Sequence, residues 1–191
     1  MSESLRIERV GVEVVRALRH QVLRPGRPAA ESVYAADDDP GTIHIAAFLG
    51  NGTPISTGIG TGIGTGIGTD AVVAVGTAIA EAAPWDRTAA AWRVRGMATR
   101  PDRRGGGLGT RVLAALLDAA TAQGAAIVWC NARVPACLLY ERAGFVTRGA
   151  VFEIPVIGPH VVMWRSVGLC QGIGGVPDGT RRDHPRNNDA I

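Results

Sequence analysis

A strand–helix–strand unit in the middle of the chain constrains the fold more than any other feature. Residues 91–99, AWRVRGMAT, alternate as the residues of a β-strand do, and apolar residues from Leu108 onward recur at helical spacing. Gly124 is a plausible end for this helix, and AAIVWCN, 125–131, is typical of a short buried strand. The sequence therefore predicts a mixed α/β fold.

The flanking segments add further strands and two more helices. Alternating or short apolar runs predict strands at 5–10, 42–49, 71–79, 145–154 and 160–167. Helices are expected at 12–23 and at 134–144, the second with Pro135 in its first turn and Gly144 at its end. A chain of 191 residues is predicted to form one domain, here residues 1–167. Residues 168–191, rich in Gly, Pro, Asp, Arg and Asn, are predicted to be a disordered tail.

Residues 57–70, TGIGTGIGTGIGTD, form a glycine repeat that does not fit a phosphate loop. Its glycines are always two apart, whereas a dinucleotide fingerprint needs gaps of two and then three. A Walker-type loop needs lysine, and all 20 basic residues of this chain are arginine. The hairpin signal Asn51-Gly52 precedes the repeat and a strand follows it. We expect an exposed hairpin insertion at about 52–70.

Composition and charge exclude several classes of protein. No run of about 20 apolar residues is present, so no membrane span is predicted. The three cysteines lack the spacing of a disulfide framework or zinc site, and no metal is expected. The N-terminal residues do not resemble a secretory signal, which favours a reduced, cytoplasmic protein. A nucleic-acid-binding module using RRDHPR, 181–186, is a weaker alternative than a solvated tail, because the net charge is only +3.

Residues 103–110, RRGGGLGT, connect the central strand to its helix and carry features of an anion site. Three consecutive glycines let backbone N–H groups approach a ligand closely. The first turn of the helix has unpaired N–H groups and the positive end of the helix dipole. With Arg103, Arg104 and Arg111 nearby, these features favour a pyrophosphate. A flexible linker is the alternative interpretation.

This loop resembles the pyrophosphate loop of the GNAT-type N-acetyltransferases, which has the pattern R/Q-x-x-G-x-G/A. Arg104, Gly107 and Gly109 match that pattern. In the family the loop follows a strand that ends in a short apolar triplet and a proline, and this chain has 97–99 and then Pro101.

A second segment, NARVPACLLYERAGF, resembles the family pattern N-x-x-A-x-x-x-Y-x-x-x-G-F. Asn131, Tyr140, Gly144 and Phe145 match it, while Ala136 supplies the small helical residue from a shifted position. The resemblance covers 91–167 strongly and 5–80 weakly. It implies a mixed, mostly antiparallel central β-sheet flanked by helices.

The resemblance also implies an activity: transfer of an acetyl group from acetyl-CoA to a primary amine by direct attack in a ternary complex. Tyr140 would protonate the departing thiolate, and Glu153 and His160 are candidates for the general base. Glu81 and Asp86 also flank the strand that enters the site. The residues implied to bind acetyl-CoA are Met97, Ala98, Thr99, Arg104, Gly105, Gly106, Gly107, Leu108, Gly109, Thr110 and Asn131.

Other aspects of function stay open at this point. A non-catalytic acetyl-CoA-binding or sensing domain of the same fold is the alternative to an enzyme. The acceptor could be a small metabolite, an antibiotic, a peptide N-terminus or a protein lysine, and a homodimer is left open. Cys130 and Cys137 lie in apolar runs and are interpreted as inert packing residues rather than nucleophiles.

Overall fold

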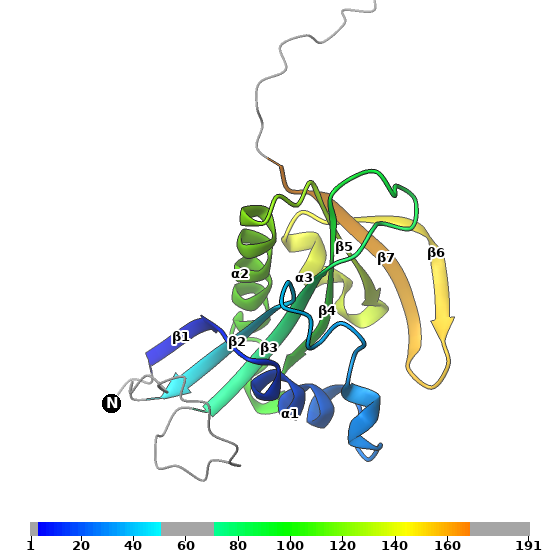
Figure 1. The fold of residues 1–191 in the computed structure, drawn as a ribbon. Helices are drawn as coiled ribbons and strands as arrows, with labels where there is room; N and C mark the ends of the chain where they lie inside the picture. The colour runs from blue at the N-terminus through cyan, green and yellow to red at the C-terminus, as the bar shows by residue number, and fades with distance from the viewer. Residues whose placement is uncertain (1–3, 51–70, 169–191) are drawn as a thin grey trace, which may run out of the picture.

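The computed structural model describes residues 4–50 and 71–168, which form a single seven-stranded sheet flanked by helices (Figure 1). The strand order is β1-β2-β3-β4-β5-β7-β6, and every neighbouring pair is antiparallel except β4 and β5. This confirms the expected mostly antiparallel mixed sheet. The strands are β1 Ser4–Arg9, β2 Ile43–Gly50, β3 Ala71–Ala80, β4 Ala91–Thr99, β5 Ile127–Arg133, β6 Val146–Ile154 and β7 Gly158–Ser166.

Several expectations fall on residues that the structure does not describe. The hairpin insertion at 52–70, the Asn51-Gly52 turn and all of the predicted tail except Gly168 lie outside the described residues. The two strands on either side of the repeat do pair: β2 and β3 are antiparallel neighbours, with Ile43 opposite Ala78.

The helices agree with the predicted ones, with one correction. α1 spans Val12–Leu23 and α2 spans Leu108–Ala122. The segment 134–144 is not one helix, because it divides into a 3-10 turn, Val134–Ala136, and a six-residue helix α3, Cys137–Arg142. Two further 3-10 turns, Ala29–Ser32 and Pro101–Arg103, were not predicted.

The physical reason for the shorter helix is the reach of β5. This strand continues to Arg133 because it pairs with β7 along its whole length, so Val134 follows the strand directly and the chain leaves the sheet through the 3-10 turn before the helix begins. Gly144 adopts a left-handed φ of 81° and ends the helix where predicted. Within the described residues, none of the helices is long and apolar enough to span a membrane.

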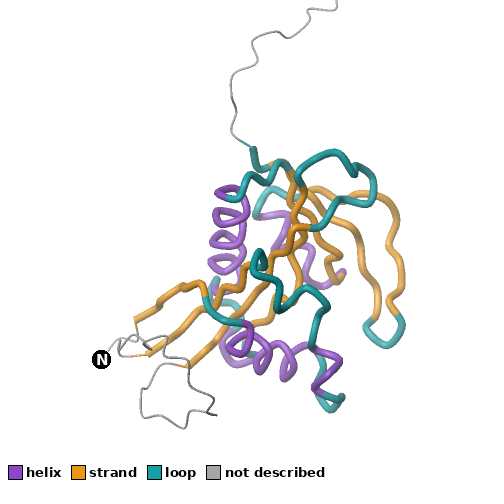
Figure 2. The backbone as a smooth tube through the Cα atoms, in the orientation of Figure 1, coloured by secondary structure: helices purple, strands orange, loops and turns teal. Residues whose placement is uncertain are grey.

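A helix packs on each face of the sheet (Figure 2). On one face, α2 buries Val112 and Leu116 against β2, β3 and β4. On the other face, α1 buries Val15 and Leu18 against Phe48 and neighbouring strand residues. The two helices thus divide the sheet into an α1 face and an α2 face, and every central strand residue belongs to one of them.

β4 contains a bulge that changes which face its residues belong to. Opposite β3, Thr77 pairs with Arg95 and Val75 pairs with Ala98, so β4 has one residue more than β3 between these pairs. Gly96 lies in the bulge with a φ of 64°, a conformation that glycine adopts without strain. A bulge leaves the backbone groups of its extra residue without a strand partner.

Two residues before the bulge begins, β4 also separates from β5. In the described chain the two strands pair only at Ala91–Arg93 of β4 and Ile127–Trp129 of β5. The edge of β4 from Val94 to Thr99 therefore presents its backbone N–H and C=O groups to an opening in the middle of the sheet.

A buried arginine on α1 organises the loop between α1 and β2. Arg19 is fully buried, and its Nη1 donates hydrogen bonds to both carboxylate oxygens of Asp37, at 2.9 and 2.7 Å, and to the Ser32 carbonyl. Its Nη2 donates to Thr77 Oγ1 at 2.7 Å. The guanidinium also lies 4.2 Å from the centre of the Tyr34 ring. Burial raises the pKa of Asp37, but hydrogen bonds from the Tyr34 backbone and from Arg19 outweigh it and leave the pKa lowered.

Arg19→Met is expected to lower the free energy of unfolding by about 3–5 kcal/mol, because it leaves the buried Asp37 carboxylate with only the more distant Arg16, 3.7 Å away, as a cation. Urea denaturation would measure this loss. Arg27→Met is the matched control, since Arg27 and Glu31 are four residues apart and partly exposed, and solvent screens the interaction of such a pair. Equal effects of the two substitutions would contradict the role given to the buried pair.

Candidate active site

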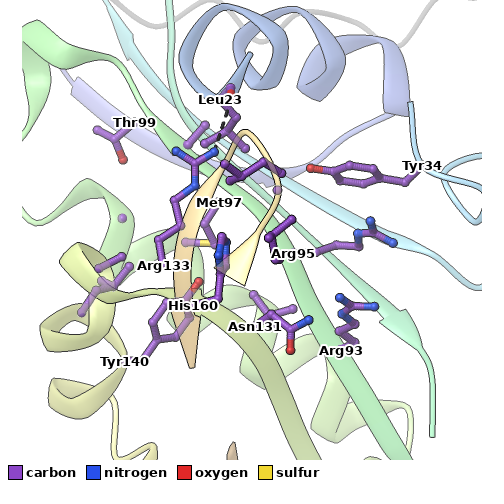
Figure 3. A pocket seen from close by; sticks show the side chains of 18 of the residues that line it. Leu23, Tyr34, Arg93, Arg95, Met97, Thr99, Asn131, Arg133, Tyr140 and His160 are labelled. Atoms are coloured by element: carbon purple, nitrogen blue, oxygen red, sulfur yellow. Dashed lines mark hydrogen bonds between the residues drawn. The ribbon is translucent and has the colours of Figure 1, made fainter. Parts of the chain in front are cut away.

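The opening between β4 and β5 holds a cavity of about 230 Å³. Figure 3 shows its side chains, with Tyr140 and Thr99 on one side and Arg93, Arg95 and Tyr34 on the other. The residues that line it come from β4, β5, β6, β7, α2, α3, the 3-10 turn before α3, the end of α1 and two loops. They are Leu23, Arg24, Tyr34, Arg93, Val94, Arg95, Gly96, Met97, Ala98, Thr99, Gly109, Asn131, Arg133, Ala136, Leu139, Tyr140, Ile154, Ile157 and His160.

The structure brings many of the predicted site residues together in this cavity. Those that line it are Met97, Ala98, Thr99, Gly109, Asn131, Tyr140 and His160. The other residues expected to bind acetyl-CoA form the loop before α2 and its first turn: Arg104, Gly105, Gly106, Gly107, Leu108 and Thr110.

Three acidic residues lie outside the cavity. Two of them were expected to flank the strand that enters the site, and the third was the acidic candidate for the general base. Glu153 is exposed on β6, opposite Pro159. Glu81 accepts a hydrogen bond from Arg93 at 2.9 Å, and Asp86 accepts hydrogen bonds from Thr88 and the Ala89 backbone. Of the predicted acid–base residues, the cavity therefore contains Tyr140 and His160.

The loop before α2 has the geometry of an anion site. Gly105 and Gly107 have φ angles of 84° and 74°, and Gly107 caps α2 without any side-chain hydrogen bond. The first backbone N–H groups of the helix therefore point outward without a side-chain acceptor. A Cβ added at Gly107 would meet no atom of the described chain within 4 Å, so open space lies in front of the loop. Arg104 is exposed beside it.

Tyr140 lies at the bottom of the cavity and is only 5% exposed. Its ring meets Phe145 edge to face, with ring centres 5.5 Å apart. Burial raises the pKa of the Tyr140 phenol well above its usual value, and the adjacent Cys130 thiol adds to the effect. Burial also raises the pKa of Cys130, to about 12, so this thiol stays protonated and fits the expected packing role.

His160 enters the cavity from β7, directly opposite Arg133 of β5. Its Nδ1 lies 2.7 Å from the Gly158 carbonyl oxygen. Because a carbonyl can only accept, Nδ1 carries the proton of the neutral ring and Nε2 is left as an acceptor. The ring is 5% exposed and is packed beside Phe152.

Sequence reasoning missed a group of cavity residues of one chemical kind. These are four arginines, Arg24, Arg93, Arg95 and Arg133, together with the aromatic ring of Tyr34. A signal for two of them was present in the strand 91–99, where Arg93 and Arg95 are two residues apart and must share a face. The strand separation that exposes that face is not visible in the sequence.

Comparison with known proteins relates the chain to one family. Residues 60–147 match the family model described as acetyltransferase (GNAT) domain. A Bacillus subtilis protein described as uncharacterized N-acetyltransferase YitI is 28% identical over 163 residues, which cover 85% of this chain and 97% of that protein. These matches identify residues 60–147 as a GNAT acetyltransferase domain.

Solved structures show that the GNAT fold extends over most of this protein. A structure from Lactobacillus plantarum, described provisionally as an N-acetyltransferase, has a TM-score of 0.63 at 18% identity and covers 86% of this chain and 99% of its own. An acyl-CoA N-acyltransferase from Pseudomonas aeruginosa has a TM-score of 0.58 at 18% identity, with the same coverage of both chains. The GNAT domain match and the similarity to an N-acetyltransferase support an N-acetyltransferase enzyme, with acyl transfer as its general chemistry. In the described residues of this protein, no group of three or more His, Cys, Asp or Glu side chains could hold a metal ion.

Proposed function

We propose that the protein transfers an acetyl group from acetyl-CoA to a primary amine, which attacks the thioester directly while both substrates are bound. The observation that carries this proposal is the separation of β4 from β5 around a cavity that contains Tyr140 and His160. The cavity opens beside the first turn of α2, where Gly109 lines it. One site thus offers an anion-binding loop, an unpaired strand edge and two acid–base side chains.

Two features would hold acetyl-CoA. The unpaired edge of β4 at 97–99 would pair with the amides of the pantetheine arm as an added strand does. Leu108, Gly109 and Thr110 would donate their backbone N–H groups to the pyrophosphate at the positive end of α2, with Arg104 beside them. Asn131, which lines the cavity from β5, would contact the pantetheine or a bound water.

Tyr140 would donate a proton to the departing thiolate. Its raised pKa keeps the phenol protonated at neutral pH, so a proton is available for transfer to the thiolate. The same surroundings raise the pKa of the Cys130 thiol to about 12. A thiolate that leaves into this region would be a stronger base than in water for the same reason, which keeps proton transfer from the buried phenol feasible.

His160 is the better placed of the two candidates for the general base, because its Nε2 can accept a proton inside the cavity. Glu153 is exposed on β6 and lies outside the cavity. An amine that attacks from the α1 face, where His160 and Asn131 lie, could pass its proton to Nε2 directly or through a water.

His160→Gln is expected to lower kcat by about 10²-fold, the low end of the range for acid–base groups, because solvent can also accept a proton from an amine. Glu153→Gln is the control and should leave kcat close to that of the wild type. Steady-state thiol release would measure both variants. A larger loss of kcat in the Glu153 variant would identify Glu153, rather than His160, as the general base.

The alternative function is a non-catalytic acetyl-CoA-binding or sensing domain of the same fold. A screen of primary amines for acetyl-CoA-dependent thiol release separates the two. Release that depends on an amine supports the enzyme, and acetyl-CoA binding without release for any amine supports the sensor. Acceptors in the screen should include small metabolites, aminoglycosides, peptides with free N-termini and lysine peptides.

A further inference from the structure

The part of the cavity away from the α2 loop is strongly positive. Arg24, Arg93, Arg95 and Arg133 all line it, and none of its lining residues in the described chain is an aspartate or glutamate. Arg95 is half-buried and lies over Tyr34, 3.7 Å from the ring centre. Among the described residues it has no hydrogen bond or ion pair, and its Nε is buried without a partner. A half-buried guanidinium without an anion is costly, since burial removes its water and nothing in the chain replaces it.

Arg133 is in a similar position on the facing strand. Its Nη2 donates a 3.3 Å hydrogen bond to the Leu23 carbonyl, a neutral acceptor. Burial is the main cause that lowers the pKa of both guanidiniums, and a neighbouring arginine is the second, Arg93 for Arg95 and Arg24 for Arg133. Both remain charged, so the cavity holds positive charges that repel one another. Arg93 differs, because Glu81 pairs with it.

These arginines are separate from the loop assigned to the pyrophosphate. Arg95 is four residues before Thr99 on β4, so its backbone lies roughly 10–13 Å from the end of the strand where the loop begins. Figure 3 shows Arg95 and Arg93 on the Tyr34 side of the cavity, away from Thr99 and Tyr140. Arg93, Asn131 and Arg133 occupy strand positions of the α1 face, while Val94, Cys130 and Ala132 pack into the α2 core. An anion bound there would belong to the acceptor rather than to acetyl-CoA.

We propose that the acceptor is a small amine that also carries a carboxylate or a phosphate, and that Arg95 binds this anionic group. The proposal rests on the function proposed above and names its acceptor class. The Arg95 guanidinium lies over the Tyr34 ring, and the same ring also contacts the guanidinium of the buried Arg19. A guanidinium held in this way presents a fixed pair of N–H donors to a carboxylate or phosphate. An acceptor held at Arg95 would extend through the cavity toward His160, which lines the same cavity from β7.

The test uses amines in matched pairs that differ in the anionic group. L-aspartate is compared with L-asparagine, L-phenylalanine with its carboxamide, and O-phosphoethanolamine with ethanolamine. The wild type should acetylate the acidic member of at least one pair with a kcat/KM at least tenfold above its partner. Preference within the amino acid pairs identifies a carboxylate, and preference within the ethanolamine pair identifies a phosphate.

Arg95→Met should remove this preference, mainly through a higher KM for the acidic amine, and should leave acetyl-CoA affinity by calorimetry unchanged. Arg95→Lys should restore part of it, because the charge returns without the planar fork. The control is Arg148→Met, since Arg148 also lies over an aromatic ring, that of Trp85, but is outside the cavity. If Arg95→Met does not fold, Arg95→Gln provides the same comparison.

Three outcomes would overturn the proposal. Equal turnover of the acidic and neutral members by the wild type refutes the anionic acceptor while the acetyltransferase function stands. A parallel loss of acetyl-CoA affinity in Arg95→Met assigns the arginine to the donor instead. Absence of thiol release with every amine contradicts the proposed function, and the acceptor class with it.

Discussion

Replacing both Gly107 and Gly109 by valine is expected to abolish acetyl-CoA binding. Gly107 precedes α2 with open space in front of it, and a Cβ at Gly109 would make only ordinary contacts of 3.5 Å with Thr99 and 3.8 Å with Leu139. The chain itself therefore has room for the new side chains. They would occupy the space that the pyrophosphate needs to reach the N–H groups of α2. Isothermal titration calorimetry with acetyl-CoA would measure the loss.

Replacing Gly107 by valine also strains the backbone, so the experiment requires a control. Gly107 has a φ of 74°, and valine in this conformation costs about 1–2 kcal/mol or more. Gly124, at the other end of α2, has a φ of 81° and also has open space around it, so Gly124→Val carries the same strain away from the loop. It should destabilise the fold similarly and still bind acetyl-CoA. Undiminished binding in a folded Gly107→Val, Gly109→Val double variant would mean that the site is placed wrongly.

Tyr140→Phe is expected to lower kcat by about 10²-fold or more and to leave acetyl-CoA affinity nearly unchanged. Phenylalanine keeps the ring that packs edge to face on Phe145 and removes only the hydroxyl group. The effect should therefore fall on the protonation of the departing thiolate rather than on packing. Stopped-flow or steady-state thiol release, together with calorimetry, separates the two contributions.

Phe145→Leu is the matched control for packing. Phe145 is buried against the Tyr140 ring and has no polar group, so the substitution loosens the same contact without removing a proton donor. It should lower the stability by about 1 kcal/mol and leave kcat within a few-fold of the wild type. Equal losses of binding and turnover in Tyr140→Phe would indicate that the tyrosine acts through packing.

Many local features of this protein could be predicted from its sequence because they depend on residues close together in the chain. α1 at 12–23, the start of α2 at Leu108 and β4 at 91–99 have the predicted bounds. Each follows from a periodic apolar pattern or from a glycine that ends a helix, and both signals act over a few residues. The prediction of an anion site at 103–110 likewise rests on glycines and arginines that are close together in the chain.

The resemblance of two short segments to GNAT proteins supplied what local patterns could not. Asn131 and Tyr140 were assigned to the acetyl-CoA site through their order along the chain, and both line the cavity. The resemblance did not distinguish Glu153 from His160 as the general base. Glu153 precedes the turn between the last two strands and His160 follows it, so both are close to the same turn. Burial separates them: His160 faces into the cavity and Glu153 is exposed.

Only the tertiary structure decided where the strands part and which charges are buried. The bulge at Gly96 and the divergence of β4 from β5 arise from pairing between segments distant in sequence, and such pairing leaves no local signal. Helical spacing places Arg19 on the same face as Val15 and Val22, but the sequence does not show how a charged residue can be fully buried there. The partners that stabilise its charge, Asp37 and Thr77, are 18 and 58 residues away. Local sequence determined the elements and the loop, whereas the long-range packing of those elements determined the cavity and its positive charge.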